Sequence, residues 1–190
     1  MRQRQARELR GSQHRQVFRN ADAALVGDDA HGMIDGHFEP QITPLGEGRT
    51  VPTFTNPPFA DIAALLGRAR VIAVVGLSAD PARPSHRVAR ALQGFGYRII
   101  PVTPTATEIL GERAVPDLDH AGPVDIVDVF RRSQFVADIV ADCIRLGVPA
   151  LWLQDGVIDE TAALRARAAG LFTVMDRCLF RDRASLGGTR

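Results

Sequence analysis

Short, largely apolar runs alternate with amphipathic stretches along most of the chain, from about residue 56 onward. A β-strand that is covered on both faces shows a run of apolar residues, because neither of its sides faces solvent. Five such runs predict buried strands at residues 71–75, 97–101, 124–129, 150–153 and 171–175. Apolar residues three and four positions apart predict helices at residues 62–67, 85–93, 135–146 and 159–169.

This alternation of strands and helices determines the expected architecture. Consecutive parallel strands are joined by right-handed crossovers, which place helices on both faces of a sheet. We therefore expect an α/β protein with a Rossmann-like, doubly wound, parallel five-stranded sheet and helices on both faces. This domain is expected to span residues 56–190.

Residues 1–55 have a different composition. The first twenty residues contain six arginines and one acidic residue, and the following segment mixes Gly, Pro and Asp with few periodic apolar positions. Such a composition predicts a flexible, poorly structured N-terminal extension, although an Arg-rich start also occurs in transit peptides and nucleic-acid-binding arms. His31 and His37 lie among acidic residues here, but their spacing matches no metal-ligand motif, so we expect no metal site.

The composition narrows the class of protein. The chain carries 23 Lys and Arg against 22 Asp and Glu, and the formal net charge of +1 gives no argument for a nucleic-acid partner. All of the basic residues are arginine, which a GC-rich genome or a phosphate-binding role would each explain. Two cysteines do not make a disulfide framework. Because the sequence shows no secretory signal and no long apolar run, we expect a cytoplasmic protein that binds no membrane.

The loop after the first predicted strand is the strongest candidate for a binding site. Gly76 and Ser78 follow the apolar run, and a proline, Ser85 and His86 open the next helix. The first turn of a helix leaves backbone N–H groups unpaired, and proline fits there because it has no N–H. A strand, a glycine-containing turn and a helix start together predict a cradle for a phosphate-bearing ligand, to which Arg83 adds a positive charge.

The expected topology brings further loops to the same place. Ligands of a doubly wound sheet bind beyond the carboxyl ends of the strands, where the strand order reverses. The four loops at this edge follow residues 75, 101, 129 and 153. With a Rossmann-like strand order, we expect the loops after the first and fourth strands to flank the crevice.

Two familiar nucleotide sites do not fit this chain. The P-loop motif G-x-x-x-x-G-K-[ST] is absent, and the sequence contains no lysine. The dinucleotide motif G-x-G-x-x-G is also absent. The second strand ends in Pro101-Val102-Thr103-Pro104, without the acidic residue that binds ribose hydroxyls in NAD sites. NAD is therefore disfavoured, but it stays an alternative.

A catalytic set is not evident in the sequence. Ser78 and His86 lack a nucleophile elbow and an orienting acid. Asp125 and Asp128 belong to a buried strand, where we expect them to cap or bridge structure rather than to share a proton. Cys178 follows the fifth strand beside an arginine, and it is either a buried structural cysteine or a reactive thiol.

A set of short segments points to a family. In order along the chain they are NPP at residues 56–58, VIAVVGLSADPARPSHRVARAL, GYRIIPVTP, ILGE, VDIVDVFRRS, LWLQDGV and AAGLFTVMDRC. In this combination they resemble the small bacterial and archaeal CoA-binding proteins, a Rossmann-like family related to the CoA-binding domain of succinyl-CoA synthetase. The resemblance covers roughly two thirds of the chain and leaves residues 1–55 without a counterpart.

The resemblance implies coenzyme A or an acyl-CoA as the cofactor, bound at the carboxyl edge of the sheet. Because ligand-binding features are present and a catalytic set is not, we expect a non-catalytic CoA-binding or accessory protein. The resemblance also implies contacts to the ligand. It places Gly76, Leu77 and Ser78 along the diphosphate, and it gives further phosphate contacts to Arg83, Ser85 and His86. Adenosine would be bordered by Val102, Thr103 and Pro104 and covered by Phe130 and Arg131. The pantetheine arm would be approached by Gln154 and Gly156.

The chain departs from the family pattern at two site positions. Thr103 stands where the family commonly has Asn, and Asp155 adds a negative charge beside a polyanionic ligand. Two other functions stay open: an enzyme that acts on an acyl-CoA thioester through Cys178 or His86, and an NAD- or nucleotide-binding regulator. The expected partner is a small molecule, and a homodimer or an unidentified protein partner also stays open.

Overall fold

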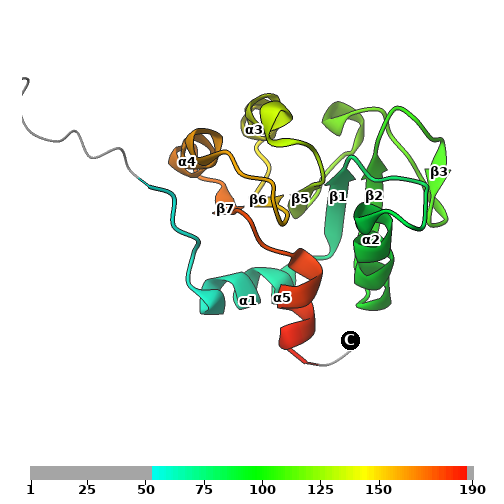
Figure 1. Ribbon diagram of the computed structural model, residues 1–190, viewed down its shortest axis with the longest axis horizontal. Helices are drawn as coiled ribbons and strands as arrows, with labels where there is room; N and C mark the ends of the chain where they lie inside the picture. The colour runs from blue at the N-terminus through cyan, green and yellow to red at the C-terminus, as the bar shows by residue number, and fades with distance from the viewer. Residues whose placement is uncertain (1–52, 188–190) are drawn as a thin grey trace, which may run out of the picture. The chain divides into compact units, whose positions relative to one another are not determined.

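The computed structural model describes residues 53–187 of the chain. Its centre is a parallel sheet of five strands in the order β2-β1-β5-β6-β7 (Figure 1). The strands are β1 (Val71–Val75), β2 (Arg98–Val102), β5 (Ile126–Val129), β6 (Ala150–Leu153) and β7 (Phe172–Val174). The predicted Rossmann-like α/β sheet of five strands is confirmed.

The strand order reverses between β1 and β5. The chain passes from β1 outward to β2 and then returns to β5 on the other side of β1, where Ile72 pairs with Ile126 and Val75 with Val129. The Rossmann-like strand order from which we expected the loops after the first and fourth strands to flank the crevice is therefore wrong. The neighbours at the reversal are β1 and β5, because the order is the flavodoxin-like one, in which β6 lies one strand further out.

Helices cover both faces of the sheet, as the alternating pattern predicts. One face packs against α3 (Val136–Arg145) and α4 (Glu160–Ala168). The other face packs against α1 (Phe59–Arg68), α2 (Pro84–Gly94) and α5 (Leu179–Ser185) (Figure 1). All four predicted helices are present, and their ends differ from the predicted ones by one to three residues.

Several local features differ from the sequence prediction. Helix α1 begins three residues earlier than predicted, after Pro58 at the cap position, and it continues one residue further, to Arg68. Asp61 lies in its first turn, where a negative charge favours the helix. The sequence pattern did not reveal α5 or the small antiparallel hairpin of β3 (Glu108–Ile109) and β4 (Glu112–Arg113).

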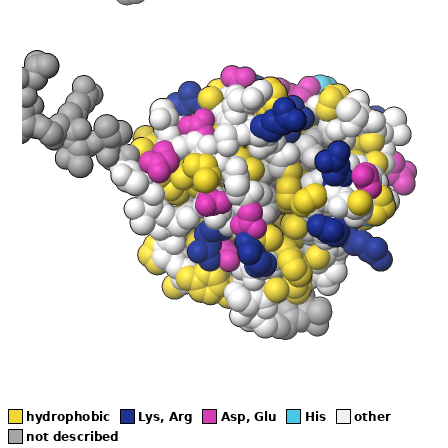
Figure 2. All heavy atoms as spheres, in the orientation of Figure 1, with side chains coloured by type: hydrophobic (Ala, Val, Ile, Leu, Met, Phe, Trp, Pro, Cys, Tyr) yellow, Lys and Arg dark blue, Asp and Glu magenta, His cyan; other side chains and the backbone are white. Residues whose placement is uncertain are grey.

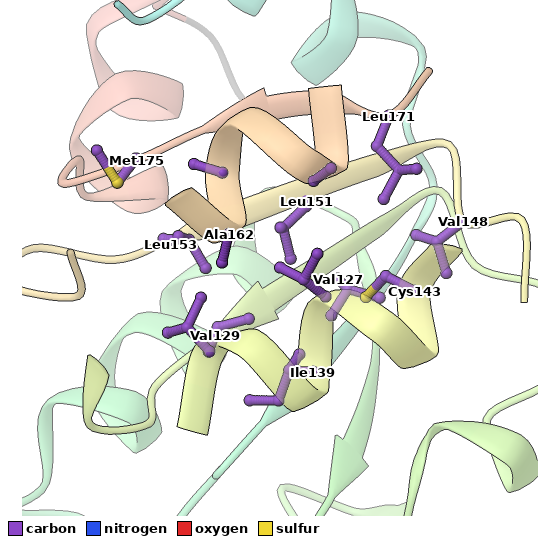
Figure 3. Packing of buried hydrophobic residues seen from close by; sticks show 14 of the residues in the cluster. Val127, Val129, Ile139, Cys143, Val148, Leu151, Leu153, Ala162, Leu171 and Met175 are labelled. Carbon is purple, nitrogen blue, oxygen red and sulfur yellow. The ribbon is translucent and has the colours of Figure 1, made fainter. Parts of the chain in front are cut away.

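Alternate residues of the central strands supply two separate hydrophobic cores. In one, Val127 and Val129 of β5 and Leu151 and Leu153 of β6 pack against α3 and α4 (Figure 3). In the other, residues such as Trp152 face α1, α2 and α5. Burial on both sides explains why these strands are apolar runs in the sequence. Their carboxyl ends lie at one edge because all five strands are parallel.

Most of the predicted extension, including His31 and His37, lies outside the described residues. Within the described part, Phe54 is buried and the guanidinium of Arg167 lies 4.2 Å from the centre of its ring. The side-chain amide of Asn56 bonds both the backbone N–H and the carbonyl of Met175, each at 2.8 Å. Contacts with the core therefore start before residue 56, and the position of the domain boundary stays a prediction.

No helix among residues 53–187 is both long enough and apolar enough to cross a membrane. Figure 2 shows positive and negative side chains interspersed on one face, with apolar atoms between them. This face therefore presents no broad surface of a single charge.

Candidate functional site

Gly76 lies at the end of β1, where the backbone of another strand approaches closely. Its φ is +84°, in the left-handed region that favours glycine. A Cβ at this position would lie 2.6 Å from the carbonyl oxygen of Phe130 and 2.8 Å from Cδ of Arg131. The N–H of Gly76 donates to the carbonyl of Val102 at 3.0 Å. Glycine is thus required where the ends of β1, β2 and β5 meet.

The loop between β1 and α2 is held by its own serines. The backbone N–H of Ser78 donates to Oγ of Ser85 at 3.2 Å, and the Ser78 hydroxyl accepts from the N–H of Asp80 at 3.2 Å. Ser85 is not the helix cap, since that position is Arg83 and Pro84 opens the helix. The first turn of α2 therefore faces the end of β1, as the cradle hypothesis requires.

A cavity of about 710 Å³ lies beyond the carboxyl ends of β1, β5 and β6, and we name it the β1–β5 cavity. It is lined by residues of the β1–α2 loop and α2 and of the segments after β5, β6 and β7: Gly76, Ser78, Arg83, Pro84, Ser85, Val88, Phe130, Arg131, Arg132, Gln154, Asp155, Val157 and Cys178. The loop after β6 reaches this cavity because β6 pairs directly with β5. Loops that are far apart in the sequence thus share one hollow.

A second cavity, of about 280 Å³, adjoins the first and contacts the end of β2; we name it the β1–β2 cavity. Gly76 and Arg131 line both cavities. The guanidinium of Arg131 lies 4.8 Å from the centre of the Phe135 ring. This cation–π contact holds the Arg131 charge where the two cavities adjoin. The smaller cavity is also lined by Val102, Thr103 and Pro104, which lie at the end of β2 and directly after it.

The charge in the β1–β5 cavity favours an anion. Arg83, Arg131 and Arg132 line it, against the single carboxylate of Asp155. The guanidinium of Arg181 donates a hydrogen bond to Asp155, and the charge of this carboxylate raises the pKa of Arg181. The negative charge that Asp155 introduces is therefore compensated by a neighbouring cation.

A family model described as a CoA binding domain matches residues 70–183, which is more than half of the chain. The chain belongs to the CoA-binding domain family. A curated relative, the uncharacterized protein YneT of Bacillus subtilis, is 43% identical over 125 residues, which are 65% of this chain and 93% of the relative. The predicted family is therefore confirmed.

Solved structures agree with this membership. The cell-free ID.343 protein from Thermus thermophilus is 37% identical, with a TM-score of 0.66 over 69% of this chain and 100% of its own. A dinucleotide-forming acetyl-coenzyme A synthetase 1 from Ca. Korarchaeum cryptofilum is 25% identical, with a TM-score of 0.50 over 56% of this chain and 26% of its own. The CoA-binding domain thus resembles one part of a much larger enzyme.

Three of the residues predicted for the site do not line either cavity of this CoA-binding domain. The side chain of Leu77 is buried in the core, which leaves only its backbone available to a ligand. His86 is half-buried in the first turn of α2. Gly156 is exposed, and its N–H donates to the carboxylate of Asp176 at 2.8 Å. The other predicted residues all line one or both cavities.

Three acidic residues beside the end of β2 were not predicted from the sequence. Asp117, Asp138 and Asp142 line the β1–β2 cavity, although none of them follows β2 directly in the sequence. Asp117 accepts from His120 at 2.6 Å, and that hydrogen bond raises the pKa of His120. No sequence signal marks these residues, because the turn before β5 and helix α3 bring them here only in the folded chain.

The two aspartates of the third predicted strand have separate roles. Asp125 accepts from the backbone N–H groups of Arg70 and Val71 at 2.7 and 2.9 Å, so it bridges structure at the opposite edge of the sheet. Asp128 is fully buried in β5 and accepts from Nε2 of Gln154 at 2.8 Å. Burial raises the pKa of Asp128 to about 7. The two carboxyl groups do not form a pair.

The two cysteines also differ in their surroundings. Cys143 is buried on α3, and this burial raises the pKa of its thiol to about 12, which keeps it unreactive. Cys178 is largely buried but lines the β1–β5 cavity just before α5. Of the two cysteines, Cys178 therefore lines a cavity at the carboxyl edge and Cys143 does not.

Proposed function

We propose that this CoA-binding domain binds coenzyme A or an acyl-CoA across the two adjoining cavities, as a protein without catalytic activity of its own. The observation that carries the proposal is the pair of cavities at the carboxyl edge, which share Gly76 and Arg131. Membership of the CoA-binding domain family supports the choice of ligand. So does the likeness to part of an acetyl-coenzyme A synthetase.

The parts of the ligand match the chemistry of the two cavities. Arg83, Arg131 and Arg132 suit the diphosphate, because guanidinium groups bind phosphate oxygens in a bidentate manner. The smaller cavity suits the adenosine portion, with Val102 and Pro104 for the base and a carboxylate such as Asp138 for hydroxyl or amine donors. The pantetheine arm is then directed past Gln154 toward Cys178.

The non-catalytic role rests on what surrounds the candidate nucleophiles. Among residues 53–187, Ser78 and Cys178 have no histidine within the lining of the β1–β5 cavity to act as a base. We extend the proposal to a cytoplasmic protein whose partner is a small molecule. Binding without turnover is consistent with a carrier, a sensor or an accessory subunit.

Thermal unfolding with CoA, acetyl-CoA, NAD and ATP in parallel tests the proposal. A ligand present at one hundred times its dissociation constant stabilises the folded state by about 2.7 kcal/mol, because it binds only that state. We expect a clear rise in Tm with CoA or acetyl-CoA and a smaller one with NAD or ATP. A rise with NAD and none with CoA would overturn the proposal in favour of a dinucleotide-binding regulator.

The position of Cys178 favours a second candidate function, an enzyme acting on an acyl-CoA thioester. Its thiol lines the cavity that we assign to the pantetheine arm. If this function is correct, the wild-type protein hydrolyses or transfers the acyl group of acetyl-CoA, and Cys178→Ala abolishes the activity. Incubation of acetyl-CoA with both proteins, followed by assay of free thiol, separates this function from simple binding.

A further inference from the structure

A buried carboxyl group is hydrogen-bonded to a residue that lines the β1–β5 cavity. Asp128 of β5 is fully buried, and its Oδ1 accepts from Nε2 of Gln154 at 2.8 Å. Its other oxygen, Oδ2, has no hydrogen-bond partner among the described residues. A half-satisfied carboxyl group in a core strand costs stability, so its presence calls for a role beyond packing.

The partner of Asp128 connects this buried group to the cavity. Gln154 is 3% exposed, yet it lines the β1–β5 cavity just after β6. The amide of glutamine has one donor nitrogen and one acceptor oxygen. Asp128 accepts one of the two N–H groups of the nitrogen, and this bond fixes the orientation of the amide. No described residue donates to the carbonyl oxygen Oε1, so Oε1 is the acceptor that the amide has available for a ligand.

The protonation state of Asp128 agrees with this arrangement. Burial raises the pKa of its carboxyl group to about 7, so the neutral acid is well populated near neutral pH. A proton on the unpartnered Oδ2 leaves Oδ1 as a carbonyl-type acceptor for the Gln154 amide. The hydrogen bond to Gln154 does not require a buried negative charge.

We infer that Asp128 is a positioning residue, which turns the carbonyl oxygen of Gln154 into the cavity as the acceptor for a secondary amide N–H of the ligand. The inference rests on the proposed function and adds a recognition element for the part of the ligand that is not a nucleotide. The pantetheine arm of CoA contains such amides, whereas adenosine 3′,5′-bisphosphate, the nucleotide half of CoA, has none. The Asp128–Gln154 pair therefore distinguishes a pantetheine ligand from a nucleotide alone.

Calorimetric titration of Asp128→Ala and Gln154→Leu with CoA and with adenosine 3′,5′-bisphosphate tests the inference. A hydrogen bond between uncharged groups contributes about 1 kcal/mol, so we expect each variant to bind CoA about three- to tenfold more weakly. Binding of the bisphosphate should stay within about twofold of wild type. The double variant should bind CoA no more weakly than the single variant with the larger loss of affinity, because both substitutions remove the same contact with the ligand.

Two further variants separate positioning from general damage. Asp128→Asn keeps an acceptor oxygen at the same place, and it should restore CoA binding to within about twofold of wild type. Asp125→Ala removes a carboxyl group that bonds only backbone at the opposite edge, and it should leave the affinity for both ligands unchanged. If Asp128→Ala does not fold, Asp128→Val, whose side chain suits a buried strand, replaces it.

The outcomes distinguish this inference from the proposed function. If wild type fails to bind CoA, the proposed function itself is wrong. If wild type binds CoA and the Asp128 variants without an acceptor bind it equally well, only the positioning role is overturned. Equal weakening of CoA and of the bisphosphate would also overturn it, because a merely structural role would affect both ligands.

Discussion

Individual residues at the carboxyl edge determine whether a ligand has room. Gly76 combines a positive φ with a close approach to the carbonyl oxygen of Phe130, so any side chain there displaces β5 or the loop. We predict that Gly76→Ala lowers CoA affinity at least about tenfold and also destabilises the fold by more than 1 kcal/mol. Isothermal titration calorimetry and urea unfolding measure the two effects.

Gly94→Ala is the matched control for this change. Gly94 ends α2, and a Cβ at this position would meet no atom within 4 Å. Alanine is therefore expected to leave CoA binding unchanged and to leave stability equal or slightly higher. Loss of CoA binding in both variants, or in neither, would contradict the role that we assign to Gly76.

The carboxyl group of Asp128 makes stability depend on pH. Its pKa in the folded protein, about 7, lies above its usual value of 3.8 because burial disfavours the charged form. Between pH 3.8 and about 7, the unfolded chain has lost the Asp128 proton while the folded protein still holds it. The contribution of Asp128 to the free energy of unfolding therefore falls as pH rises through this range, and it is constant above it. The neutral side chain of Asp128→Asn removes this dependence.

Urea unfolding of wild type and Asp128→Asn at pH 5 and pH 8 checks this prediction. The wild type should lose more stability than the variant between the two pH values, by roughly 1 to 3 kcal/mol. Parallel pH profiles for the two proteins would show that Asp128 is ionised throughout and that its environment differs from the one described.

At the scale of elements, sequence patterns predicted the long units well and the short ones poorly. The five strands are buried on both faces, and their apolar runs are therefore distinct in the sequence. The hairpin of β3 and β4 has strands of two residues each, and α5 has seven residues, which is too short for a clear period. Packing against the rest of the protein, rather than local pattern, places these elements.

The side chain of Asn56 attaches the start of the described chain to the end of β7. Asn56 bonds both the N–H and the carbonyl of Met175, directly after β7. We predict that Asn56→Ala lowers the free energy of unfolding by about 1 to 3 kcal/mol, because two backbone groups lose their partner. Urea unfolding measures the change.

Gln134→Ala is the control for the Asn56 variant, because Gln134 is exposed and lies in the short turn before α3. It should change stability by less than about 0.5 kcal/mol. An Asn56 variant as stable as this control would show that the contact with Met175 contributes nothing to the fold.

At the scale of the whole molecule, the sequence predicted the family and which loops lie at the carboxyl edge, but not how these loops meet. Residues 76–86 and the segments after β2, β5 and β6 were all recognised as parts of one edge. Asp117, Asp138 and Asp142 were not, because they lie in the turn before β5 and in α3, away from β2 in the sequence. The placement of β5 beside β1 also depends on packing that no local pattern reveals.

Removal of residues 1–50 tests the proposed division into an extension and a domain. The described core contains its own hydrophobic contacts from Phe54 onward. We predict that the truncated protein keeps its Tm to within about 2 °C and its affinity for CoA to within about twofold. A shift of this size is smaller than the shift in Tm that the loss of a core contact causes. A large fall in Tm would show that the first fifty residues belong to the folded domain.

The central claim is that the adjoining cavities at the carboxyl edge bind coenzyme A. Calorimetric titration of the purified full-length protein with CoA tests it most directly, with NAD titrated under the same conditions. We predict saturable binding of one CoA per chain and weaker binding of NAD. Absence of saturable CoA binding would contradict the account, and saturable binding of NAD in its place would favour a dinucleotide-binding regulator.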